Sequence, residues 1–165
     1  MDNFKSQACF TNGTKILCEN GYLLVDYLKQ GDLVQTYRHG SLPIEYIYSE
    51  QIINNPTNIY KSMYRLPTFE GYGDLIVMGG NGLLKQTLDT QDFKNDPELF
   101  KVRSNFVVDS FLLQRVAHCK NFIKITDNNM YTYYYLSLKG RKYQRYGIWA
   151  NGVLMESTFK NDNLI

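Results

Sequence analysis

An all-β fold of short strands and hairpins, with at most one or two short helices, is the class that this sequence predicts. The 14 Tyr and 9 Phe residues favour strands over helices. Asn-Gly pairs, which suit tight hairpin turns, recur along the chain at 12–13, 20–21, 81–82 and 151–152. Apolar and polar residues alternate in several short segments between these turns, as expected of half-buried strands.

The first third of the chain reads as a succession of strands. Residues 14–18 form a strand candidate with Ile16 and Cys18 on one face. An extended segment or one helical turn follows, then the turn at Gly31-Asp32 and a strand through Val34 and Thr36. In residues 43–48, Ile44, Tyr46 and Tyr48 alternate with Glu45 and Ile47, which predicts a strand with the first set on one face.

The remaining elements are less regular until the end of the chain. Residues 74–78 are a buried strand candidate before the Gly-rich turn 79–82, and residues 89–100 hold a single short helix. Residues 105–119 favour strand because of their β-branched side chains. The strongest strand signals are 130–138 and the hairpin 146–158, with its Asn-Gly turn.

Composition and charge limit the classes of function. The net charge of +2 argues against a nucleic-acid partner. The alternative is a module that contacts nucleic acid through a basic hairpin tip with Arg141, Lys142 and Arg145. No apolar stretch reaches the ~18 residues of a membrane span, and the first residues lack a signal peptide's apolar centre, which indicates an intracellular protein. The cysteines Cys9, Cys18 and Cys119 have no metal-ligand spacing, so no metal and no cofactor are expected.

The segment around Cys9 contains a Cys followed by an apolar residue, a G-T-x-I pattern, a turn Gly, a Val and Leu, and a G-D-x-V pattern. These positions are Cys9, Phe10, Gly13, Thr14, Ile16, Gly21, Val25, Leu28, Gly31, Asp32 and Val34. In this register the segment resembles the start of Hint domains, the fold shared by hedgehog autoprocessing domains and inteins. The final hairpin also looks like that of Hint proteins of large DNA viruses. The resemblance implies residues 1–8 as an N-terminal extension and 9–165 as a single Hint-like domain.

In this family the thiol attacks the preceding carbonyl and converts a peptide bond into a thioester by an N–S acyl shift, which here would act at Ala8–Cys9. The thiol must ionise, an oxyanion must be stabilised, and an acid must protonate the departing nitrogen. The family's T-x-x-H motif supplies the acid, but Met78 and Asn81 stand at the Thr and His positions of this chain. A later histidine that the viral pattern carries is replaced by Tyr135.

The sequence therefore predicts a degenerate Hint-like domain that is inactive or slow in autoproteolysis and serves as a structural or interaction module with a protein partner. If the chain is viral, we expect this module to be a virion or assembly component. The alternative is an active, self-cleaving domain with Cys9 as nucleophile and Asn81 and His118 as helpers. Each residue also has a plainer interpretation: Cys9 as a small buried side chain, His118 as a structural imidazole, and Asn81-Gly82 as a turn.

Overall fold

The computed structural model describes residues 8–68, 71–88, 90–95, 107–141 and 144–158. The regular structure of the described chain is mostly antiparallel strand, with one short α-helix, which confirms the predicted fold class. The strands are β1 Cys9–Thr11, β2 Lys15–Cys18, β3 Gly21–Leu24, β4 Leu33–Gln35, β5 Ser41–Ile53, β6 Met63–Leu66, β7 Leu75–Met78, β8 Gly82–Lys85, β9 Val107–Val108, β10 Phe111–Arg115, β11 Ile123–Lys124, β12 Met130–Leu138, β13 Gly147–Ala150 and β14 Val153–Glu156. The helices are η1 Val25–Tyr27, α1 Thr90–Asn95 and η4 Val116–His118.

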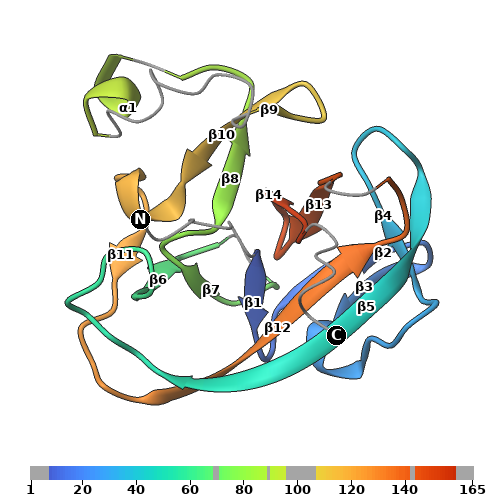
Figure 1. Cartoon of the computed structure of the whole chain (residues 1–165), viewed down its shortest axis with the longest axis horizontal. Helices are drawn as coiled ribbons and strands as arrows, with labels where there is room; N and C mark the ends of the chain where they lie inside the picture. The colour runs from blue at the N-terminus through green and yellow to red at the C-terminus, as the bar shows by residue number, and fades with distance from the viewer. Residues whose placement is uncertain (1–7, 69–70, 89, 96–106, 142–143, 159–165) are drawn as a thin grey trace.

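Strand β12 lies at the centre of the arrangement. It pairs with β5 along its whole length and with β1 on its other edge. The long β5–β12 pair curves along one side of the molecule, and β1 lies against its inner edge (Figure 1). Strand β1 also pairs with β7, so the N-terminal strand lies between β12 and the middle of the chain.

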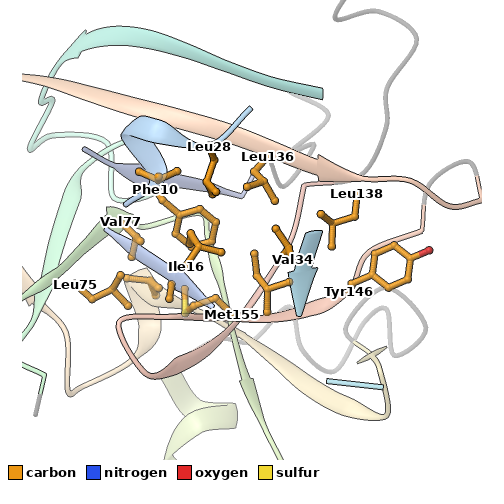
Figure 2. Close-up of a cluster of buried hydrophobic side chains, with 14 of the residues drawn as sticks. Phe10, Ile16, Leu28, Val34, Leu75, Val77, Leu136, Leu138, Tyr146 and Met155 are labelled. Carbon is orange, nitrogen blue, oxygen red and sulfur yellow. The ribbon is translucent and has the colours of Figure 1, made fainter. Parts of the chain in front are cut away.

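The main core collects side chains from both ends of the chain. Phe10, Ile16 and Val34 of the first third meet Leu136 and Met155 of the last strands (Figure 2). Ile148 belongs to the same cluster. All of these side chains are fully buried. Burial of each large apolar side chain is worth about 1.5–3 kcal/mol relative to exposure. This core fixes β1 against β12 and thereby places the residue that starts β1.

The residues that carry the Hint resemblance have clear structural roles near the N-terminus. Gly13 takes a φ of 83°, and its N–H donates to Asp26 Oδ2 at 2.6 Å. The buried Thr14 donates its hydroxyl to the Thr11 carbonyl at 2.7 Å and closes the same turn. These side chains build the turn between β1 and β2.

Most predicted elements are confirmed. Strands β2, β7 and β12, the helix α1 within residues 89–100, and the β13–β14 hairpin all lie where the pattern placed them. Ile16 and Cys18 share the buried face of β2 as predicted. The part of the 89–100 segment after Asn95 lies outside the described residues.

Three details of the prediction are wrong. Tyr46 was predicted to share a face with Ile44, but Tyr46 is 42% exposed while Ile44 is buried. Ile47, predicted on the other face, packs against the same core as Ile44. The alternation changes because the β5–β12 register shifts between Ser137 and Leu138. The Gly-rich turn predicted at 79–82 is present, but Gly79 and Gly80 are its central residues and not the Asn81-Gly82 pair, since Gly82 already lies in β8.

The third wrong detail concerns His118. The segment 105–119 does contain β9 and β10, but it ends in the 3-10 helix η4. His118 therefore lies at the end of a helical turn and not within a strand. The sequence around Val116 could not distinguish a strand from a helical turn, because a single helical turn is too short to show helical periodicity.

Candidate active site around Cys9

Cys9 begins β1 and is held between two neighbouring strands. Its backbone pairs with Tyr135 of β12, and the next residue, Phe10, pairs with Val77 of β7. The side chain is 1% exposed. It packs in a second apolar cluster, the Cys9 cluster, which also contains Met63, Tyr133 and Tyr135, with Tyr48, Ile52, Ile76, Met78, Ile125 and Tyr131 around it.

Asn81 contacts Cys9 through three hydrogen bonds. The Cys9 backbone N–H donates to Asn81 Oδ1 at 3.3 Å, and the Cys9 thiol donates to the same oxygen at 3.6 Å. Asn81 Nδ2 donates to the Cys9 carbonyl at 2.5 Å. The side chain is itself buried, and the Gly79–Gly80 turn presents it with its N–H bonded to the Met78 carbonyl at 3.0 Å. The structure thus brings residue 81 against the nitrogen that an N–S acyl shift would release.

The environment of Cys9 keeps the thiol protonated. Burial raises the pKa of the Cys9 thiol to about 12, and the negative charge of Glu50 acts in the same direction. A hydrogen bond from the Met78 backbone lowers the pKa but does not offset burial. At pH 7 a thiol with such a pKa is almost entirely protonated. The nucleophilic form is therefore scarce.

Tyr135, the residue at the expected histidine position, lies beside Cys9 in a chain of hydroxyl groups. Its O–H donates to the Tyr133 hydroxyl at 3.1 Å, and Tyr133 donates to Glu50 Oε2 at 3.0 Å. Burial raises the pKa of Tyr135 far above its ordinary value, and that of Tyr133 to about 12. Neither phenol ionises near neutral pH. Met78 lies at the end of β7, packs against the Cys9 cluster and has no hydroxyl to donate.

His118 has a different setting. Its Nε2 lies 3.0 Å from the Tyr60 hydroxyl, and the two rings meet edge to face. It lines an open hollow of about 390 Å³ together with Ala117, Cys119, Lys120 and Phe122. Helix η4 is attached to the Gly79 carbonyl by the Ala117 N–H at 2.9 Å. None of the contacts described for His118 is with Cys9 or Asn81.

One residue at the site was missed by the sequence analysis. The hydroxyl of Thr158 donates a hydrogen bond to the carbonyl oxygen of Ala8, the carbonyl that Cys9 would attack. Thr158 is 3% exposed, and its own N–H donates to the Leu136 carbonyl at 3.1 Å. The two partners are 150 positions apart in the chain. No local motif marks this threonine, so only the fold shows the contact.

The structure also bears on a metal site, the basic hairpin cluster and a membrane span, which the sequence analysis considered. Among the described residues no group of three or more His, Cys, Asp or Glu side chains could hold a metal ion. Arg145 of the basic cluster forms a largely buried ion pair with Glu156 at 2.8 Å, while Arg141 is exposed. Lys142 lies outside the described residues. In the part of the chain that the structure describes, no helix is long and apolar enough to cross a membrane.

The comparison with known families agrees with this architecture. Residues 8–64, which begin at the Ala8–Cys9 bond, match the family model of the Hint domain. The described chain adopts a Hint/intein-like fold of antiparallel strands. The comparison with curated protein sequences finds no match.

Solved structures with a similar fold are inteins and an intein-like domain. The Ssp DnaB mini-intein variant M86 aligns over 94% of this chain and 97% of its own, with a TM-score of 0.56 and 9% identity. A bacterial intein-like domain from Clostridium thermocellum aligns over 90% and 98%, with a TM-score of 0.54 and 14% identity. A DnaB intein from Synechocystis sp. PCC 6803 aligns over 92% and 99%, with a TM-score of 0.50 and 9% identity. At these identities the likeness concerns the fold.

Proposed function

We propose that this chain is a Hint-like domain, residues 9–165, in which self-cleavage at Ala8–Cys9 is arrested or slow, and that it serves as a structural or interaction module. The observation that carries the proposal is the position of Asn81. Its Oδ1 accepts the hydrogen bond of the Cys9 N–H at 3.3 Å, where an acyl shift needs a group that gives a proton to the departing nitrogen. An amide side chain has no proton to transfer near neutral pH.

The thiol adds a second barrier to the reaction. With a pKa raised to about 12, Cys9 is almost entirely un-ionised at pH 7. In addition, an amide nitrogen that leaves without protonation is a very poor leaving group, and general acid–base catalysis is worth ~10²–10⁴-fold. Loss of the acid at position 81 and burial of the thiol therefore act on successive steps of the same reaction.

Intact-mass spectrometry tests this proposal directly. We expect the wild-type chain to keep residues 1–8 during incubation at neutral pH, with or without hydroxylamine to trap a thioester. Asn81→His and Met78→Thr/Asn81→His should release residues 1–8, because an imidazole at position 81 can protonate the Cys9 nitrogen. Cys9→Ala is the negative control in both backgrounds. Asn81→Ala removes the hydrogen bonds without supplying an acid and should remain uncleaved.

Cleavage of the wild-type chain, absent in Cys9→Ala, would instead establish the second candidate function, an active cysteine-dependent self-cleaving domain. The contacts of Asn81 with the nitrogen, carbonyl and thiol of Cys9 favour it, since they fix the bond that would be cut. In that case Asn81→Ala should slow the release of residues 1–8. His118→Ala would show whether the histidine beside Tyr60 assists.

The partner of an arrested domain is proposed to be another protein. The resemblance of the final hairpin to Hint proteins of large DNA viruses supports a virion or assembly role. Detection of the chain in purified particles by mass spectrometry, at a constant ratio to the major coat protein, tests that role. Absence of the chain from such particles would refute the virion role but not the arrest of self-cleavage.

A further inference from the structure

The carbonyl of Ala8 is held by a residue from the opposite end of the described chain. Thr158 donates its hydroxyl hydrogen to this oxygen from a buried position. We propose that Thr158 is the oxyanion donor of the site: its hydroxyl polarises the Ala8 carbonyl and stabilises the negative charge that develops on it when Cys9 attacks. This inference rests on the proposed function and names the oxyanion donor for the Ala8–Cys9 reaction that Asn81 arrests.

The backbone fixes the position of this hydroxyl. The Thr158 N–H bonds to the Leu136 carbonyl at 3.1 Å, and Thr158 forms an isolated parallel bridge with Ser137. The preceding residue, Ser157, is bonded twice to Tyr146, with its N–H donating at 2.8 Å and its hydroxyl accepting at 2.9 Å. The backbone of the donor and the residue before it are therefore held in place before any reaction begins.

Strand β12 sets the spacing between nucleophile and donor. Tyr135 pairs with Cys9, and the next two residues of the strand, Leu136 and Ser137, hold Thr158. The backbones of the nucleophile and of the donor are thus held by adjacent residues of one strand. An oxyanion donor needs this kind of preorganisation, because it gains most when no reorganisation occurs during the reaction.

The chemistry assigns each group a separate task. Cys9 Sγ forms a bond to the Ala8 carbonyl carbon, and the carbonyl π electrons move to the oxygen that accepts the Thr158 hydrogen bond. The bond between this carbon and the Cys9 nitrogen then breaks, its electron pair stays on the nitrogen, and the C=O bond of the thioester re-forms. The proton lost by the thiol is the proton gained by the nitrogen, so no other reactant is consumed. Thr158 keeps its own proton throughout.

Cleavage kinetics in the Asn81→His background test the role of the hydroxyl. Thr158→Val keeps the size of the side chain but lacks the donor, and we expect hydroxylamine-induced release of residues 1–8 to slow by ~10²–10³-fold. Thr158→Ser keeps the hydroxyl and should stay within a few-fold of the parent. Thr36→Val is the matched control, since Thr36 is also buried and donates to a carbonyl, that of Gly40, at 2.7 Å in another hairpin. Equal rates for Thr158→Val and its folded parent would overturn the proposal.

A second readout does not depend on cleavage. Ala8-Cys9 is the sole Ala-Cys dipeptide in the sequence, so labelling with ¹³C-carbonyl alanine and ¹⁵N-cysteine selects one carbonyl–amide signal by NMR. We expect the Ala8 carbonyl resonance to move upfield in Thr158→Val and to stay in place in Thr158→Ser and Thr36→Val. An unchanged Thr158→Val resonance would refute the hydrogen bond. If Asn81→His does not cleave, the explanation of the arrest by residue 81 fails, while this measurement still tests the hydrogen bond between Thr158 and Ala8.

Discussion

At Cys9, burial and charge act on the thiol in the same direction. Desolvation is the larger cause of its raised pKa, and the Glu50 carboxylate adds to it. Glu50 is exposed, yet the Tyr135–Tyr133 hydroxyl chain connects its carboxylate to the interior beside Cys9. The carboxylate thus favours the protonated thiol through its charge, and the two phenols cannot replace a histidine as a proton carrier.

Glu50→Gln should therefore lower the pKa of the Cys9 thiol. The glutamine amide oxygen can still accept the Tyr133 hydrogen bond, so the variant removes mainly the charge. We expect a decrease of less than about one pH unit, because burial is the larger cause and remains. The measurement is the pH titration of thiolate ultraviolet absorbance, taken as the difference from the matched Cys9→Ala protein. Glu19→Gln, which changes an exposed carboxylate in the turn before β3, should leave the titration unchanged.

At the scale of elements, the turn between β7 and β8 presents Asn81 to Cys9. Gly79 is packed so closely that an added Cβ would lie 1.9 Å from the Ile59 carbonyl oxygen and 2.7 Å from Tyr64 Cε2. Gly80 has more room, with Tyr60 O 3.3 Å from the corresponding point. The turn also carries the hydrogen bonds from Gly79 N–H to Ser62 and from Ala117 N–H to Gly79.

Gly79→Ala should destabilise the domain and loosen the site, with Gly80→Ala as the matched control. The added methyl group must displace backbone at position 79, which typically costs about 1–3 kcal/mol, whereas at position 80 a small adjustment suffices. Urea unfolding measures the stability difference, and the rate of Cys9 modification by a thiol reagent reports on the site. Equal stability and equal Cys9 reactivity in the two variants would show that the turn does not hold Asn81 in place.

Local patterns predicted the elements better than the site. The alternation in residues 14–18 and 130–138 correctly predicted β2 and β12, because one face of each strand packs against the core and carries apolar side chains. Tyr46 was assigned to the wrong face because a shift in strand register depends on the partner strand and not on local alternation. The contact between residue 81 and Cys9 was implied by the family resemblance. Thr158 could not be found, since its partner is set by the pairing of distant strands.

At the scale of the whole molecule, the site depends on closure of the chain. Cys9 comes from the first strand, Asn81 from the β7–β8 turn, Tyr135 from β12 and Thr158 from the end of the β13–β14 hairpin. These segments meet because β12 pairs with β1 and β5 (Figure 1). In addition, Leu136 and Ser137 of β12 hold Thr158. Closure of the chain buries Cys9, so ionisation of the thiol should affect the global stability.

Stability should consequently fall as the pH rises from about 9 towards about 12. Cys9 has an ordinary pKa of 9.0 and a folded-state pKa of about 12, so the contribution of its protonated form is fully present below pH 9. Above that pH the unfolded chain ionises before the folded one, and stability is lost until the folded thiol also ionises. The difference corresponds to at most about 4 kcal/mol, and the raised pKa of Tyr133 and Tyr135 acts in the same direction.

Urea unfolding at pH 7, 9 and 11, followed by Trp149 fluorescence, should show this fall in the wild-type chain. Cys9→Ala loses a small amount of packing at every pH, but its stability should depend less steeply on pH above 9, because the ionising thiol is gone. The comparison therefore uses slopes and not absolute stabilities. Tyr135→Phe should reduce the slope further, since it removes a second group whose pKa is raised by burial. Identical slopes for the wild type and Cys9→Ala would mean that the thiol is exposed to solvent in the folded protein.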